Sequence, residues 1–181
     1  VEIANITFYT KTKTMKKLYL LSIIVLAVAC TPPAPTVVES VERSIGFHSN
    51  NELKEFKWHL GTEDAIDLVK ALDKAWVARD YAAMKNYFAD TLRITTYNGK
   101  VFTSFEDFEI NVAEDTTGGW IFDRAFSVDL DPALGGEHVQ AFFNSFDINP
   151  EGDTIKYKIY ESYYVVNKKI VWLDQFRQET K

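Results

Sequence analysis

Cysteine, histidine and basic charge are scarce in this 181-residue sequence, and each scarcity narrows the class of protein. The single cysteine rules out an internal disulfide. The net charge is −6, so repulsion from phosphate argues against nucleic acid as a partner. No apolar run reaches the roughly 20 residues that a transmembrane helix needs. The sequence also lacks a Gly-rich phosphate loop and a serine nucleophile elbow, which leaves two common catalytic motifs out of consideration.

Residues 15–30 have the layout of an export signal. A short basic segment, Met15-Lys16-Lys17, precedes an apolar stretch from Leu18 to Val28 and then a small residue before Cys30. Ala27-Val28-Ala29-Cys30 resembles the lipobox of bacterial lipoproteins, in which the cysteine is diacylated and the leader is cleaved just before it. Ala27 stands where that family usually has Leu, and the same three residues also fit the A-x-A rule of an ordinary secretory signal. We expect lipidation, because the only cysteine falls at the position that it requires.

The signal sets the expected boundaries along the chain. Residues 1–14 play no part in it, and we expect them to be a start-site artefact upstream of Met15. Residues 15–29 are then the leader, 30–38 the lipidated cysteine with a proline-rich tether, 39–60 an N-terminal arm and 61–181 the folded domain. Without residues 1–29 the net charge becomes −9, because that segment holds four of the 20 basic residues and one of the 26 acidic ones. The expected location is the cell envelope, with the anchor in the outer membrane or on the periplasmic face.

Capping residues and apolar periodicity predict three helices at the start of the domain. Thr62 precedes Ile66, Val69, Leu72, Ala75 and Trp76 at helical spacing. Asp80 precedes a short helix that carries Met84, Tyr87 and Phe88, and Ser104 with Asp107 forms a capping box before Phe105, Phe108 and Val112. Between the last two helices, Leu92–Tyr97 favours a strand, and Asn98-Gly99 favours a hairpin turn. A helix around Glu52–Trp58 in the arm is a further expectation.

Four long strands are predicted after the helices, at 120–130, 137–148, 154–166 and 170–178, separated by Gly-, Pro- and Asn-containing turns. Simple alternation places Trp120, Phe122, Phe126 and Val128 on one face of the first of them. The prediction is therefore an α+β fold with three N-terminal helices packed in a strongly curved antiparallel sheet, a cystatin-like, cone-shaped roll.

Three segments, 75–84, 87–90 and 164–171, resemble the nuclear transport factor 2-like (SnoaL-like) superfamily. The first reads Ala-Trp-Val-Ala-Arg-Asp-Tyr-Ala-Ala-Met, and the last reads Tyr-Val-Val-Asn-Lys-Lys-Ile-Val. The resemblance implies a bent sheet wrapped around the first helix, a pocket at the open end of the cone and frequent dimerisation through the sheet. A homodimer is accordingly expected.

The same superfamily contains ketosteroid isomerase-like enzymes, whose mechanism needs a carboxylate base opposite a tyrosine and a protonated aspartate. The corresponding positions here are Thr96, Leu72 and Ser162, none of which is the required residue type. Tyr97 is one residue away and would point to the other face of its strand. The isomerase mechanism is therefore rejected.

A few other side chains are candidates for chemistry. His138 either reaches the pocket or lies at a rim or dimer surface, while His48 and His59 have no metal-ligand spacing, so no metal site is expected. Asp90 is either a buried acid or a turn cap. Asp174 lies between Trp172 and Phe176 on one strand face; Arg124 is its candidate partner, because Arg177 points to the opposite face. Both ends of that pair could equally be exposed to solvent.

An aromatic pocket with a few polar groups is the expected ligand site. Its candidate residues are Trp76, Trp120, Phe122, Arg124, Tyr160, Ser162, Tyr164 and Asp174. The same residues could instead form the core or a dimer interface. The predicted function is binding of a small apolar or aromatic ligand, or protein interaction, by a membrane-anchored domain. The alternative is a cofactor-free enzyme of hydratase, isomerase or cyclase type that uses Asp174 or His138; no cofactor is expected in either case.

Overall fold

The structure is a computed structural model that describes residues 45–114 and 118–180. The chain divides into two compact units, residues 1–42 and 43–181, and all described residues belong to the second. The predicted leader, the tether and Cys30 lie outside the described residues.

Three helices occur in the described residues: α2 (Glu63–Val77), α3 (Tyr81–Lys85) and α4 (Phe105–Ala113). Each begins where a capping side chain accepts a backbone N–H bond in the first turn. Thr62 accepts from Ala65, Asp80 from Ala83 at 2.9 Å, and Ser104 from Asp107 at 3.2 Å. These bonds confirm the three helix starts that the sequence predicts.

One curved sheet holds all eight strands of the described residues. Its order is β1-β2-β5-β6-β7-β8-β3-β4, which leaves β1 and β4 at opposite ends and the sheet unclosed. The strands are β1 (Gly46–Phe47), β2 (Lys57–Leu60), β3 (Phe88–Thr95), β4 (Val101–Phe102), β5 (Gly119–Asp129), β6 (Glu137–Ile148), β7 (Thr154–Val166) and β8 (Lys169–Glu179).

Two features of the predicted architecture differ from the structure. The sheet is mixed, because β3 runs parallel to β8 while the other pairings are antiparallel. The chain between those two strands is long enough for the crossover that parallel pairing requires. The helices also do not all precede the sheet, since β1 and β2 come before α2, and β3 and β4 separate α3 from α4. The α+β class and the curled sheet stand.

The ends of two predicted elements also shift. Phe88 was expected on the second helix, but it begins β3, where it is buried and pairs with Ile170 of β8. Pairing in the sheet outweighs the helical spacing of a single aromatic residue. The arm carries a turn at 51–55 followed by β2 in place of the expected helix. Asp90 is exposed within β3, which rules out its interpretation as a buried acid.

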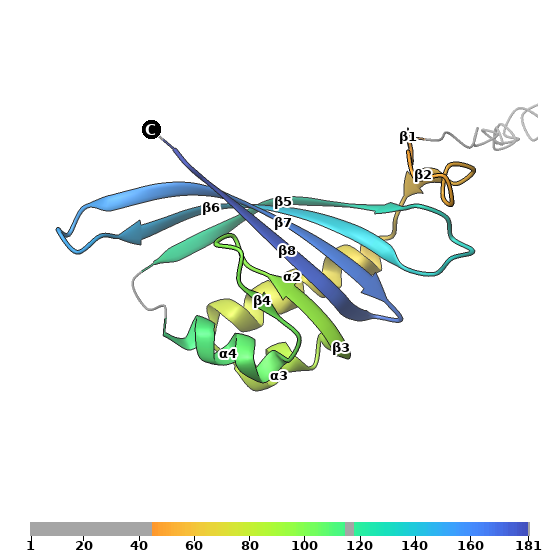
Figure 1. Cartoon of the computed structure of the whole chain (residues 1–181). Helices are drawn as coiled ribbons and strands as arrows, with labels where there is room; N and C mark the ends of the chain where they lie inside the picture. Colours follow the sequence, from red (N-terminus) through yellow and green to blue (C-terminus); the bar gives the residue numbers. More distant parts are fainter. Residues whose placement is uncertain (1–44, 115–117, 181) are drawn as a thin grey trace, which may run out of the picture. The chain divides into compact units, whose positions relative to one another are not determined.

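The core lies between the helices and the concave face of the sheet. Figure 1 shows α2, α3 and α4 on the same face of the long strands, and α2 packs against β5 and β6. Val69 and Leu72 of α2 are fully buried there with Val139 and Ala141 of β6 and Tyr163 of β7. A Leu72→Ala substitution in such a core typically costs about 2–5 kcal/mol of stability. The helices therefore define an inner face of the sheet and leave an outer face.

Candidate functional site

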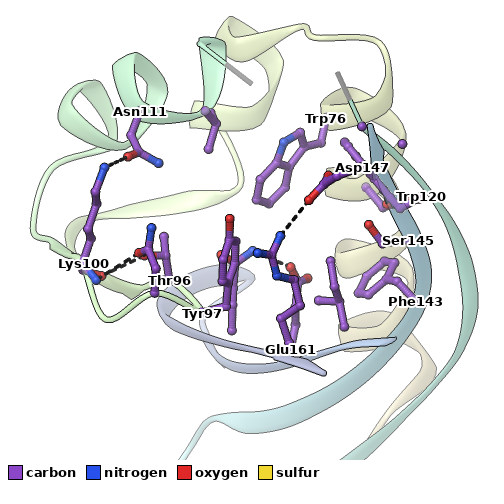
Figure 2. Close-up of a pocket in the computed structure, with 18 of the residues that line it drawn as sticks. Trp76, Thr96, Tyr97, Lys100, Asn111, Trp120, Phe143, Ser145, Asp147 and Glu161 are labelled. Carbon is purple, nitrogen blue, oxygen red and sulfur yellow. Dashed lines mark hydrogen bonds and ion pairs between the residues drawn. The ribbon is translucent and has the colours of Figure 1, made fainter. Parts of the chain in front are cut away.

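A cavity of about 380 Å³ opens between the helices and the inner face of the sheet. Its wall combines the rings of Trp76, Trp120 and Phe143 with polar side chains from α2, β6, β7 and β8. Figure 2 shows these rings and the carboxyl groups of Glu161 and Asp147 around one hollow. Enclosure by aromatic rings with a few convergent polar groups is the usual character of a small-molecule site.

Glu161 of β7 is the most unusual group in the cavity wall. Its side chain is only 5% exposed, and its oxygens accept hydrogen bonds from the Tyr163 hydroxyl and, at 2.6 Å, from Nε2 of Gln175. Burial raises the pKa of Glu161 to about 7; the two hydrogen bonds lower it and the charge of Asp73 raises it. Near neutral pH the group therefore exists in both protonation states, which an ordinary exposed glutamate does not.

Asp73 of α2 is a further carboxyl group in the wall whose pKa is raised. Nε1 of Trp120 donates a hydrogen bond of 2.8 Å to its Oδ1. Burial raises the pKa of Asp73, and that hydrogen bond partly opposes the rise. The Trp120 ring in turn meets the Trp76 ring edge to face, with centroids 6.0 Å apart. Two carboxyl groups with raised pKa values thus share one aromatic cavity.

Arg177 of β8 is a basic residue of the cavity wall, and its guanidinium has three contacts. Its Nη1 pairs with Oδ2 of Asp147 at 2.9 Å. Its guanidinium lies 3.7 Å from the ring centroid of Tyr97 and 4.1 Å from that of Tyr157. Two cation–π contacts hold the guanidinium against these rings. Figure 2 shows Tyr97 and Asp147 in the wall, with the ion pair to Asp147 drawn as a dashed line.

The sequence-predicted pocket residues divide between the two faces of the sheet. Trp76 and Trp120 line the cavity, and Phe122 packs edge to face on Phe143, which also lines it. Tyr160, Ser162 and Tyr164 of β7 share one strand face, as alternation requires, but it is the outer face, because Glu161, Tyr163 and Val165 point inward and are buried. Both faces of β7 carry aromatic residues, so periodicity alone does not identify the inner one.

Asp174 also lies on the outer face, where it is opposite Ser162 in the β7–β8 register. The cavity is lined instead by its neighbours of opposite parity, Gln175 and Arg177. Asp174 is therefore not placed to act on a ligand in the cone.

A β-bulge in β5 separates Arg124 from the cavity. The register pairs Phe122 with Phe143 and Arg124 with Phe142, which leaves Asp123 as an extra residue. Alternation is reset there, so Trp120 and Phe122 face inward, while Arg124 and Phe126 meet outer-face residues. Arg124 pairs with Asp123 and lies 4.3 Å from the ring centroid of Phe142. The expected Arg124–Asp174 pair does not form.

His138 lies on the outer face among aromatic rings. Its ring centroid is 4.6 Å from that of Tyr164, 5.2 Å from that of Trp58 and 5.8 Å from that of Trp172. Burial by these rings lowers the pKa of His138. Its position matches the surface interpretation and removes it from the cavity.

Sequence reasoning missed the residues that the structure brings together, namely Asp73, Glu161, Tyr163 and Gln175. A signal for Asp73 was present, because it lies four residues after Val69 and three before Trp76, on the same helix face. The three residues at the positions of the isomerase mechanism do not lie together. Thr96 lines the cavity, Leu72 is in the core and Ser162 is on the outer face.

The described residues contain no cluster of three or more His, Cys, Asp or Glu side chains arranged to hold a metal ion. None of their helices has the length and apolar character needed to cross a membrane.

Comparison with known proteins identifies the fold. No protein-family model and no curated protein matches the sequence. Among solved structures, an NTF2-like protein of unknown function from Burkholderia pseudomallei is similar, with 14% identity and a TM-score of 0.50 over 65% of this chain and 92% of that one. An LEH-like epoxide hydrolase from M. tuberculosis has 14% identity and a TM-score of 0.51, over 65% and 84%.

The association domain of C. elegans CaMKII is similar as well, with 10% identity and a TM-score of 0.52 over 63% of this chain and 93% of that one. Likeness at such low identity extends to the arrangement of helices and strands and to nothing finer. The described domain therefore has a nuclear transport factor 2-like fold.

Proposed function

We propose that this protein binds a small organic molecule inside the cone. The observation that carries the proposal is the cavity of about 380 Å³, whose aromatic wall contains the buried carboxyl group of Glu161. Removing a carboxyl group from water costs free energy unless hydrogen bonds or a ligand compensate for the lost hydration. The epoxide hydrolase from M. tuberculosis is an enzyme on a similar fold, which supports the capacity of the fold to receive small molecules.

Ligand binding is tested with a pair of matched serine variants. Ser145 lines the cavity from β6, whereas Ser162 lies on the outer face of β7. Native mass spectrometry of protein purified from its source is expected to show a bound small molecule. Ser145→Phe fills the cavity and should remove that mass, and Ser162→Phe should retain it. A bound mass that persists in Ser145→Phe, or a wild-type protein that stays empty against a broad compound library, contradicts the proposal.

A second candidate function, acid–base catalysis, is favoured by the pKa of Glu161, which burial raises to about 7. A group with this pKa both donates and accepts protons at neutral pH, which is the requirement for general acid–base catalysis. Asp73 supplies a second carboxyl group in the same wall. The candidate enzyme needs no cofactor and uses Glu161 in the role that the sequence assigned to Asp174 or His138.

Catalysis is tested by screening small epoxides and enolisable ketones for turnover. Glu161→Gln keeps the shape of the side chain and removes its titration, so turnover of any substrate found should fall by about 100-fold or more. Ligand binding should weaken far less than turnover in the same variant. Unchanged turnover in Glu161→Gln, or ligand binding with no turnover of any compound, leaves a binding protein.

We also propose that Cys30 anchors the domain to a membrane at the cell envelope, outside the cytoplasm. The support is the lipobox-like sequence Ala27-Val28-Ala29-Cys30 with its single cysteine. Diacylation adds two chains whose burial, at about 0.8 kcal/mol for each methylene, holds a soluble domain at a bilayer. A fatty-acid label should appear on the wild-type protein and be absent from Cys30→Ser. Equal membrane association of the two proteins argues against the anchor.

Self-association through the outer face of the sheet is a further proposal. A row of rings crosses β5 to β8 there, formed by Phe126, Phe142, Tyr160 and Phe176 at centroid distances of 5.1–6.1 Å. Phe126 is 49% exposed and Phe176 is 57% exposed, and exposed aromatic patches mark interaction sites. Analytical ultracentrifugation should find a dimer that Phe176→Asp dissociates. Ile110→Asp, on α4 and away from this row, is the control; a wild-type monomer contradicts the proposal.

A further inference from the structure

The cavity wall contains two acidic groups, Asp73 and Glu161, that have no basic partner among the described residues. In the ion pairs between described residues, neither Asp73 nor Glu161 takes part. Their hydrogen-bond donors are neutral: the indole of Trp120 for Asp73, and the Tyr163 hydroxyl and Gln175 amide for Glu161. Buried carboxylates usually meet a cation or a metal. A ligand can therefore supply the positive charge that compensates these carboxyl groups.

The basic side chains in the same wall are engaged elsewhere. Arg177 pairs with Asp147 and makes cation–π contacts with the rings of Tyr97 and Tyr157. Nζ of Lys100 donates to Oδ1 of Asn111 at 2.8 Å. Arg79, which also lines the cavity, is not free either. No cation is among the causes of either pKa shift. Burial and the Trp120 hydrogen bond act on the pKa of Asp73, while burial, two neutral donors and the charge of Asp73 act on that of Glu161.

Aromatic rings surround the two carboxyl groups. The indole that holds Asp73 belongs to Trp120, and it meets Trp76 edge to face at 6.0 Å. Phe143 lines the same cavity, as does Tyr163, which bonds Glu161. Ring faces attract cations, most strongly where water is excluded, and the indole is the strongest of these rings. Aromatic faces and uncompensated carboxyl groups together match a small organic cation.

We infer that the ligand of this cavity carries a cationic amine or quaternary ammonium head, which binds among Asp73, Glu161, Trp76 and Trp120. The inference rests on the proposed binding function and specifies its ligand class. An anion would meet the charge of Asp73, and a neutral ligand would leave that charge uncompensated. The cavity volume suits a head group with a short aromatic or aliphatic body.

The test compares three compounds of one size that differ in charge: benzylamine, benzyl alcohol and benzoate. Isothermal titration calorimetry of the full chain at pH 7 should give a dissociation constant for benzylammonium at least about tenfold below that for benzyl alcohol. Benzoate should bind more weakly than both. This comparison needs no variant, so misfolding of a mutant protein cannot obscure it.

Proton release provides a second readout. Glu161 faces Asp73 of α2, Tyr163 of its own strand and Gln175 of β8, and shares the cavity with Asp147 and Arg177. A cation among them favours the ionised form of Glu161, so benzylammonium should displace part of a proton at pH 7. The binding heat should then differ between two buffers of unlike ionisation enthalpy. In Glu161→Gln that difference should vanish.

Variants complete the test. Asp73→Asn and Glu161→Gln should bring the affinities for benzylammonium and benzyl alcohol to within about twofold, because each removes one carboxyl group. Asp174→Asn, on the outer face, should keep the tenfold preference. Equal or tighter binding of benzyl alcohol or benzoate by the wild type overturns the cation inference and leaves the binding function standing. If none of the three compounds binds, the cation inference fails, and native mass spectrometry of the purified protein decides separately whether the cavity binds another molecule.

Discussion

The indole N–H of Trp120 donates to a carboxyl oxygen of Asp73 at 2.8 Å, across 47 positions of the sequence. The bond joins β5 to α2 at the wall of the cavity. Trp120 lies on β5 three residues before the bulge at Asp123. Its position there allows its indole to lower the pKa of Asp73.

Trp120→Phe should destabilise the protein and raise the pKa of Asp73 further, because the indole bond lowers that pKa. The loss of a hydrogen bond to a half-buried charged group is about 1–3 kcal/mol. Urea unfolding of Trp120→Phe, Asp73→Asn and the double variant measures the coupling between the two side chains. A coupling energy within error of zero would mean that the bond contributes nothing to folding.

Glu161 should make the protein less stable as pH rises through neutrality. Its pKa is about 7 in the folded protein and near 4.5 in the unfolded chain, so the folded state binds the proton more tightly. The contribution of Glu161 to the unfolding free energy is therefore fully present below pH 4.5. It is lost as the pH rises to 7 and above, and the total loss is about 3 kcal/mol. Glu161→Gln should remove this loss. The difference in unfolding free energy between variant and wild type, followed from pH 4 to pH 9, isolates the contribution, and a flat difference refutes it.

His138 should make the protein less stable as the pH falls below neutrality. Burial lowers its pKa below the 6.5 of the unfolded chain, so the unfolded chain binds the proton more tightly. Stability from this group is present above pH 6.5 and is lost as pH falls below it. Melting temperatures at pH 7.5 and 5.5 should differ less in His138→Gln than in the wild type. An equal difference in the two proteins would show that burial of His138 does not affect the stability.

Deletion of Asp123 should disrupt the domain. The extra residue lets Trp120 and Phe122 face inward while Arg124 and Phe126 face outward, and its loss moves one of these pairs to the wrong face. Burying Arg124 or exposing Trp120 is expected to cost several kcal/mol. Circular dichroism and urea unfolding check this. Deletion of Gly135 is the milder control. This residue lies in the β5–β6 loop, and no atom lies within 4 Å of the place that a side-chain carbon would occupy there.

Much of the fold follows from local sequence signals. Thr62, Asp80 and Ser104 mark helix starts, because short polar side chains satisfy the first backbone N–H groups. Asn98-Gly99 marks a turn in which Gly99 adopts a positive φ of 84°. The four long strands begin and end within one residue of their expected bounds. The parallel pairing of β3 with β8 was not predictable in this way, because it depends on contacts between residues about 80 positions apart.

The site was harder to predict, because it depends on which face of each strand is covered. On β7, aromatic residues occur on both faces, so Tyr160 and Tyr163 fit an inner position equally well by sequence alone. On β5 the bulge at Asp123 reverses the alternation that would have placed Arg124 in the cavity. Glu161 was passed over because an acidic residue in a strand usually faces water. Its burial becomes visible only in the folded structure, where its oxygens accept bonds from Tyr163 and Gln175.

Direct titration of the Glu161 carboxyl group tests the central claim, that the cone holds an ionisable group adapted to a ligand. Carbon-13 NMR of protein labelled at the glutamate carboxyl carbon follows each group with pH, and the Glu161→Gln variant assigns the resonance. The account predicts a midpoint near 7 for Glu161. A midpoint near 4.5, the value of an exposed glutamate, would contradict it.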